Sequence, residues 1–139
     1  MDYIVKRITD YDAKILKYIL ESGLEISKIY GDKFNWLNFK INQVLKEHYV
    51  WLCLDSKEEL KGIMIATLSP CFWDPSLKML RQELIYTSNP IATAELIRYF
   101  IDFGRNNANH VIMCIGEKTN IKESSLNKLG FDKLECALS

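Results

Sequence analysis

The sequence has 139 residues, of which 48% are hydrophobic and 26% are charged, and 18 basic side chains balance 18 acidic ones. This length and composition predict one folded domain over residues 1–139 and argue against a disordered or fibrous chain. The zero net charge predicts no direct binding to nucleic acid or to an anionic membrane, and no apolar run reaches the roughly 18 residues of a membrane span.

The N-terminal part of the chain predicts one strand and two helices. Residues 3–8 are β-rich and short, which is typical of a strand. Thr9 or Asp10 then caps an amphipathic helix that ends at Gly23. A second segment with apolar residues at helical spacing follows Asn35 and predicts another helix.

The middle of the chain predicts three consecutive strands. Apolar residues 49–54 and 60–68 flank a polar turn, so they predict a hairpin that the dipeptide Ser69-Pro70 closes. A loop over residues 72–75 leads to a long strand over residues 77–87.

The C-terminal part alternates between helices and strands. Asn89-Pro90 is a typical helix start, with Asn at the N-cap and Pro in the first turn, and this helix ends near residues 106–107. A buried strand over residues 110–115, a short helix over residues 120–129 and a last strand over residues 131–138 complete the chain.

The order of these elements predicts the topology. Short connections make the central strands antiparallel, whereas the strand, helix and strand from residue 77 to residue 115 predict a right-handed parallel crossover. We therefore expect an α+β fold with three layers, α/β/α, around a mixed, mostly antiparallel sheet.

Cysteine and histidine residues do not form a metal-binding pattern. None of Cys53, Cys71, Cys114 and Cys136 belongs to a Cys-x-x-Cys pair, and the chain has only two histidines, so we expect no metal. Residues 1–7 lack the apolar core of a secretion signal, which predicts a cytoplasmic protein with reduced thiols.

Three local segments add a family resemblance. They are Pro70-Cys71-Phe72-Trp73 followed by Gln82-Glu83-Leu84-Ile85-Tyr86, then Asn120 at the start of the short helix, and Lys128-Leu129-Gly130-Phe131. In this order the segments resemble the GNAT N-acetyltransferase superfamily, and in particular its short phage-encoded members, over nearly the whole chain. The resemblance implies a GNAT-like fold and transfer of an acetyl group to an amine.

The resemblance also implies acetyl-CoA as the acyl donor. Its pantetheine arm would lie along the strand at Ile85 and Thr87. Asn120, or Thr119 before it, would bond to the arm, although Asn120 is also explained as an N-cap. Its pyrophosphate would lie at the start of the next helix, where free N–H groups and the helix dipole attract an anion. The residues implied at that helix start are Ile91, Ala92, Thr93 and Ala94.

The helix start departs from the family pattern. The family has a basic or amide residue and two glycines there, which let phosphate oxygens approach the backbone. The corresponding residues are Ser88-Asn89-Pro90-Ile91-Ala92-Thr93, with side chains at both glycine positions and no N–H on Pro90. Helix capping alone is an equally good explanation of Asn89-Pro90.

Glu83 is the candidate general base, because a carboxylate here can accept a proton from the attacking amine. The alternative is an ordinary strand carboxylate paired with Arg81 or a lysine. Strand alternation places Glu83, Ile85 and Thr87 on one face of the sheet, and Gln82, Leu84 and Tyr86 on the other. Leu126 stands where the family has a Tyr that acts as the general acid, so the candidate replacements are Tyr86 and a water on the substrate side.

The leading hypothesis is an acetyl-CoA-dependent N-acetyltransferase that acts by direct attack of a small-molecule or protein amine. No activated nucleophile is evident for an acyl-enzyme. The rival hypothesis is a catalytically degenerate GNAT-fold phage protein with a structural, virion or assembly role. In that case Phe72, Trp73 and Trp36 contact a phage structural protein, and the protein is in the host cytoplasm or associated with the virion.

Overall fold

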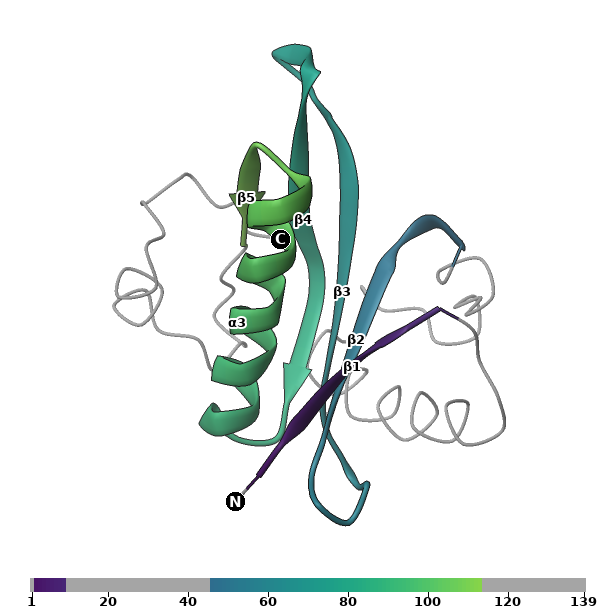
Figure 1. The fold of residues 1–139 in the computed structure, drawn as a ribbon, viewed down its shortest axis with the longest axis vertical. Coiled ribbons are helices and arrows are strands. Elements are labelled where there is room, and N and C mark those ends of the chain that lie inside the picture. Colours follow the sequence, from purple (N-terminus) through teal and green to yellow (C-terminus); the bar gives the residue numbers. More distant parts are fainter. Residues whose placement is uncertain (1, 10–45, 114–139) are drawn as a thin grey trace, which may run out of the picture.

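The computed structural model describes residues 2–9 and 46–113. The first two expected helices, the short helix that Asn120 opens and the last strand lie outside the described residues. The described elements are strands β1 (Ile4–Ile8), β2 (Tyr49–Leu54), β3 (Leu60–Cys71), β4 (Asp74–Thr87) and β5 (His110–Ile112), and helix α3 (Pro90–Asn107) (Figure 1).

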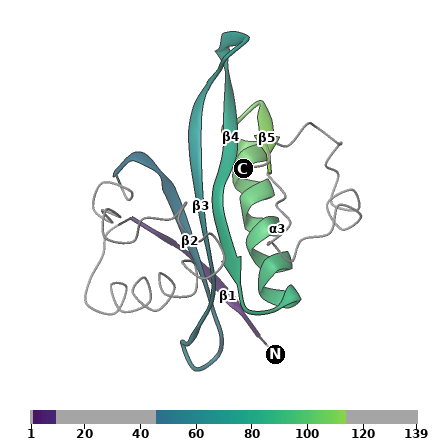
Figure 2. The same cartoon turned by 180° about the vertical axis from the view of Figure 1, so that it is seen from behind.

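The five strands form one mixed sheet in the order β1-β2-β3-β4-β5. The first four strands pair antiparallel. β4 and β5 pair parallel, with Leu80 opposite Val111, and α3 connects them. Both views show α3 running beside β4 and β5 (Figures 1 and 2). The expected parallel crossover and the α+β class are confirmed.

Apolar side chains are buried on both faces of the sheet. On the α3 face, Trp51, Met64 and Ile85 pack with Leu96 and Phe100 of the helix. A second buried cluster on the opposite face comprises Ile8, Val50, Leu52, Leu54, Ile63, Ile65 and Leu84. A sheet buried on both faces agrees with a three-layer arrangement.

The β3–β4 hairpin is longer than the sequence predicts. β3 continues through Pro70 to Cys71, and only Phe72 and Trp73 separate it from β4. We call these two residues the hairpin tip; it projects beyond the other strands (Figures 1 and 2). Near this end of the hairpin the register shifts, because Pro70 pairs with Lys78 whereas Cys71 pairs with Asp74. The register shift accommodates the extra residues of β4, and β3 therefore continues past Pro70.

Two negative findings concern the described residues alone. In this part of the chain no helix is both long and apolar enough to cross a membrane. The same residues contain no group of three or more His, Cys, Asp or Glu side chains that could hold a metal ion.

Candidate functional site

A β-bulge interrupts β4 at Glu83. Ile65 of β3 pairs with Leu84, and the next residue, Ala66, pairs with Gln82, so Glu83 has no partner in the register. The described pairing between β4 and β5 ends just before this point, at Arg81 opposite Ile112. A bulge of this kind redirects side chains and increases the local twist of the strand.

The bulge overturns the predicted distribution of side chains between the two faces. Ile85 lies in the cluster under α3, whereas Leu84 lies in the cluster on the opposite face. Arg81 is opposite Thr67, two residues from Ile65, so Arg81 shares the face of Leu84. Glu83 bonds to Arg81 and therefore lies on that face, not on the face of Ile85.

Glu83 forms an exposed ion pair with Arg81. The Nε and Nη2 atoms of Arg81 donate to Oε1 of Glu83 over 3.0 and 2.9 Å. The side chains are 49% exposed for Arg81 and 37% exposed for Glu83. The alternative interpretation of Glu83 as a carboxylate paired with Arg81 thus describes the resting contact, which leaves Oε2 available to accept a proton.

Tyr86 lies on the same face as Glu83 because of the bulge. Its half-buried ring packs against the cluster that contains Leu84, and its register partner is Ile63. Ile85 is buried on the α3 face, next to the half-buried Thr87 at the end of the strand. The bulge therefore brings together the candidate base and the candidate acid, which simple alternation would separate.

The start of α3 is capped as the sequence predicts. Asn89 has extended backbone angles, and its Oδ1 accepts a hydrogen bond of 2.9 Å from the amide of Ala92. The Thr93 amide donates to the Asn89 carbonyl, and the Thr93 hydroxyl bonds to both that carbonyl and the Thr87 hydroxyl. Pro90 occupies the first turn.

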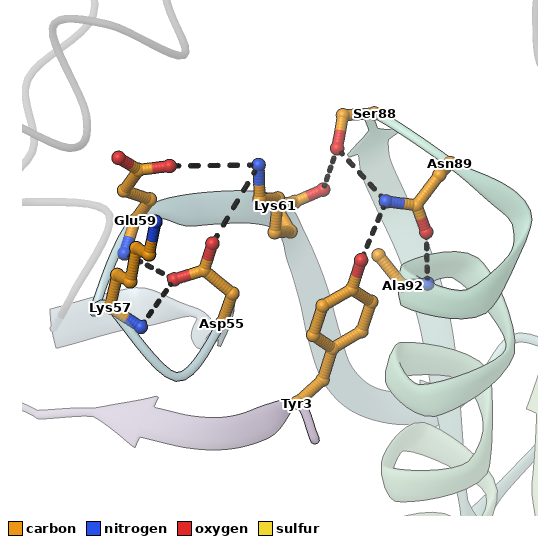
Figure 3. Close-up of polar contacts among 8 residues, drawn as sticks. All are labelled: Tyr3, Asp55, Lys57, Glu59, Lys61, Ser88, Asn89 and Ala92. Carbon is orange, nitrogen blue, oxygen red and sulfur yellow. Dashed lines mark hydrogen bonds and ion pairs between the residues drawn. The ribbon is translucent and has the colours of Figure 1, made fainter. Parts of the chain in front are cut away.

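Asn89 also connects the helix start to the first strand. Its Nδ2 donates to the hydroxyl of Tyr3 over 2.9 Å, while its Oδ1 caps the helix (Figure 3). The amide and hydroxyl of Ser88 both donate to the carbonyl of Lys61. These contacts hold the turn between β4 and α3 against β3 and against Tyr3, the residue that precedes β1. The sequence analysis missed them because they join residues far apart in the chain.

The β2–β3 turn next to Ser88 is built around Asp55. Its Oδ1 accepts from the amides of Lys57 and Glu59, and Glu58 adopts a positive φ of 63°. The Glu59 amide, then the Lys57 amide and the ammonium groups of Lys61 and Lys57, lower the pKa of Asp55 from its usual 3.8 despite its burial. The Lys61 ammonium lies 3.8 Å from both the Asp55 and Glu59 carboxylates (Figure 3).

The start of α3 can accept an anion only if the hydrogen bonds that cap it rearrange. The side chains of Ala92 and Thr93 are buried, so only their backbone amides are relevant, and Asn89 already engages both. Ile91 is 52% exposed, Ala94 is also exposed, and the positive end of the helix dipole lies there. A phosphate at this turn would have to bind at Ile91 and to replace the Asn89 side chain at the Ala92 amide.

His48 makes a contact that the sequence does not reveal. It precedes β2, is half-buried, and its Nδ1 lies 3.2 Å from the hydroxyl of Thr67. Thr67 is the register partner of Arg81. Polar groups of β3, of β4 and of the residue before β2 thus lie near the bulge, on the face opposite α3.

Two cysteines of the described residues are buried. Cys71 ends β3 and is 1% exposed. Burial, followed by the negative charge of Glu95, raises the pKa of Cys53 from 9.0 to about 11. A thiol with this pKa stays protonated near neutral pH and does not act as a nucleophile.

Comparison with known proteins identifies the fold. No family model matches the chain, and no curated protein does. A solved structure named a probable acetyltransferase covers 97% of this chain and 92% of its own, at a TM-score of 0.75 and 13% identity. A transcriptional regulator from Bacillus halodurans C-125 shares 12% identity over 99% of this chain and 98% of its own, at a TM-score of 0.71.

A third similar structure contains a ligand. It is AAC(6′)-Iy in complex with the bisubstrate analogue CoA-S-monomethyl-acetylneamine, with 11% identity over 99% of this chain and 95% of its own, and a TM-score of 0.72. At these identities the likeness concerns the fold alone. The chain has the α+β fold of acetyltransferases, which confirms the GNAT-like architecture that the sequence predicts.

Proposed function

We propose that this chain, as a single domain over residues 1–139, is an acetyl-CoA-dependent N-acetyltransferase. The observation that carries the proposal is the bulge, which places the Glu83 carboxylate and Tyr86 on one face, where β4 ceases to pair with β5 in the described residues. The fold of acetyltransferases and the start of α3 at the end of the same strand support it.

In the proposed reaction Glu83 acts as the general base. When bound, acetyl-CoA supplies an acetyl thioester, and the acceptor nitrogen attacks it directly, so that a C–N bond forms and the C–S bond breaks. Glu83 takes the proton from the nitrogen through Oε2, which the contact with Arg81 leaves open. Tyr86 gives its phenolic proton to the departing thiolate.

The start of α3 is the proposed site for the pyrophosphate. The amide of Ile91 and the positive end of the helix dipole attract the anion, and the Ala92 amide joins them when the Asn89 side chain moves away. Ile85 and Thr87 would lie along the pantetheine arm. Asn120, outside the described residues, remains a proposed contact to that arm.

The base is tested by Glu83→Gln, which keeps the shape of the side chain but cannot accept a proton. We expect kcat to fall roughly 10²- to 10⁴-fold, and the loss to shrink at high pH, where more of the amine is already neutral. Glu95→Gln is the matched control, because Glu95 also pairs with an exposed arginine. A Glu83→Gln protein with the kcat of the wild type from pH 6 to 9 would remove Glu83 from the mechanism.

The pyrophosphate site is tested by Ile91→Glu. Ile91 is exposed, and a carboxylate in the first turn favours the helix, so the protein should remain folded. Acetyl-CoA at about 100 times its Kd should stabilise the wild type by about 2.7 kcal/mol, and the variant should lose this shift through charge repulsion. Ile91→Gln is the neutral control. Equal shifts in both variants and the wild type would exclude this site.

A second candidate function is non-catalytic binding to a protein partner, which is the structural or assembly role of a phage protein. The observation that favours it is the hairpin tip, where Phe72 is 95% exposed and Trp73 is 59% exposed. Exposed neighbouring aromatic side chains are typical of contacts with a protein partner. If millimolar acetyl-CoA produces no thermal shift in the wild type, this second candidate replaces the first.

A further inference from the structure

We propose that the acceptor is a zwitterion, namely an amine with a carboxylate on the neighbouring carbon, as in a free α-amino acid. The inference rests on the proposed acetyltransferase function and concerns the Arg81–Glu83 pair. It assigns Glu83 to the amine of the acceptor and Arg81 to its carboxylate.

Arg81 and Glu83 each keep an atom that their ion pair does not use and that can bind a ligand. Arg81 uses Nε and Nη2, and both donate to the same oxygen of Glu83, Oε1. In the described part of the chain no contact occupies Nη1 of Arg81 or Oε2 of Glu83. Both side chains are exposed on the same face, so a ligand can reach a free donor and a free acceptor together.

The two opposite charges are neighbours, as they are in an α-amino acid. The Nη2 atom of Arg81 lies 2.9 Å from Oε1 of Glu83, so the guanidinium and the carboxylate are side by side. In an α-amino acid the nitrogen and the carboxyl carbon are likewise close, because only two covalent bonds separate them. Placed antiparallel to the pair, the ammonium contacts Glu83 and the carboxylate receives the guanidinium in the geometry that arginine favours.

The charge of the pair discriminates between classes of amine. A simple amine is attracted to the Glu83 carboxylate but places its positive charge next to the guanidinium of Arg81. A polycation places several positive charges there. A zwitterion satisfies both groups. Because an exposed ion pair contributes little to stability, a small adjustment of the Arg81–Glu83 contact on binding does not disturb the fold.

The experiment compares matched acceptors. The twenty free amino acids and their twenty amides, together with spermidine, are assayed with acetyl-CoA by release of the thiol, and binding of the same compounds without acetyl-CoA is followed by saturation-transfer NMR. The variants are Arg81→Gln, which removes the charge, and Arg81→Lys, which keeps it. Arg98→Gln is the control, since Arg98 forms a similar exposed pair with Glu95 on α3.

We expect an amino acid to exceed its amide by about tenfold in kcat/KM and to give the stronger NMR signal, as a charged hydrogen bond predicts. Arg81→Gln should abolish this ratio by raising KM, Arg81→Lys should retain part of it, and Arg98→Gln should leave it unchanged.

Three results would overturn the inference. If an amide or spermidine is the better acceptor and Arg81→Gln does not alter the ratio, the inference is wrong while the acetyltransferase function stands. If acetyl-CoA binds but no amino acid is acetylated or bound, the zwitterionic acceptor is again wrong. If acetyl-CoA does not bind and nothing is acetylated, the proposed function fails as well.

Discussion

Cys53 is a buried thiol whose ionisation is coupled to folding. It lies on β2 under α3, where burial and then Glu95 raise its pKa from 9.0 to about 11. The folded protein therefore holds the proton at pH values where the unfolded chain releases it, so this contribution to stability is present below pH 9 and is lost as the pH rises towards 11. Wild type should lose stability over this range more steeply than Cys53→Ala.

Alkylation provides a direct measurement of the same property. At pH 8 we expect iodoacetamide to leave Cys53 unmodified in the folded protein and to modify it after unfolding in guanidinium chloride, as followed by peptide mass mapping. Rapid modification of Cys53 in the folded protein would contradict both its burial and its raised pKa.

Glu83 shows what a sequence reveals about a single residue and what it does not. The segment around it indicated a candidate base, and the structure places this residue at a bulge in β4. The bulge itself could not be predicted, because it depends on how β3 and β4 pair. One extra residue moves Glu83 to the face of Leu84 and Tyr86, and no periodicity within β4 records that shift.

At the scale of elements, local capping makes α3 the most predictable part of the described chain. Asn89 and Pro90 mark its start and the helix ends at Asn107, as expected. β2 also has the predicted bounds, since apolar residues fill it. β3 and β4 are longer than predicted, because their pairing with each other carries β3 past Pro70 to Cys71 and starts β4 at Asp74, beyond the limits that local propensity alone sets.

The packing of α3 on β5 depends on Gly104. A Cβ atom at this position would lie 2.2 Å from Cγ2 of Val111, so Gly104→Ala requires the Val111 side chain, the helix or the strand to shift. We expect a loss of stability of about 1–3 kcal/mol, even though alanine favours the helix by about 1 kcal/mol relative to glycine. Denaturant unfolding measures the difference.

The double variant isolates the cause of that loss. In a Val111→Ala background the close contact is removed, and the nearest remaining atoms, Cδ2 of Leu80 and Cβ of Val111, lie at 3.4 and 3.5 Å. Gly104→Ala should then be neutral or stabilising by up to about 1 kcal/mol. An equal loss in both backgrounds would show that Val111 is not the obstacle.

At the scale of the whole molecule, β4 separates two surfaces with different proposed uses. The hairpin tip precedes its first residue, Asp74, and the start of α3 follows its last residue, Thr87. At about 3.3 Å per residue, 14 residues of strand span about 46 Å. An acceptor small enough to lie at Glu83 therefore does not contact the tip, and the acetyl-transfer and partner-binding proposals concern opposite ends of the hairpin (Figure 1).

This separation predicts opposite outcomes for two variants. Phe72 is 95% exposed, so Phe72→Ser should change the free energy of unfolding by no more than about 0.5 kcal/mol and should preserve the thermal shift that acetyl-CoA produces. Ile91→Glu should keep the fold and lose that shift, because its carboxylate lies where the pyrophosphate is proposed to bind. Both variants are measured by thermal unfolding with and without acetyl-CoA. If Phe72→Ser abolishes the shift, the ligand depends on the tip, and the site at the start of α3 is wrong; if both variants keep the full shift, acetyl-CoA binds elsewhere on the protein.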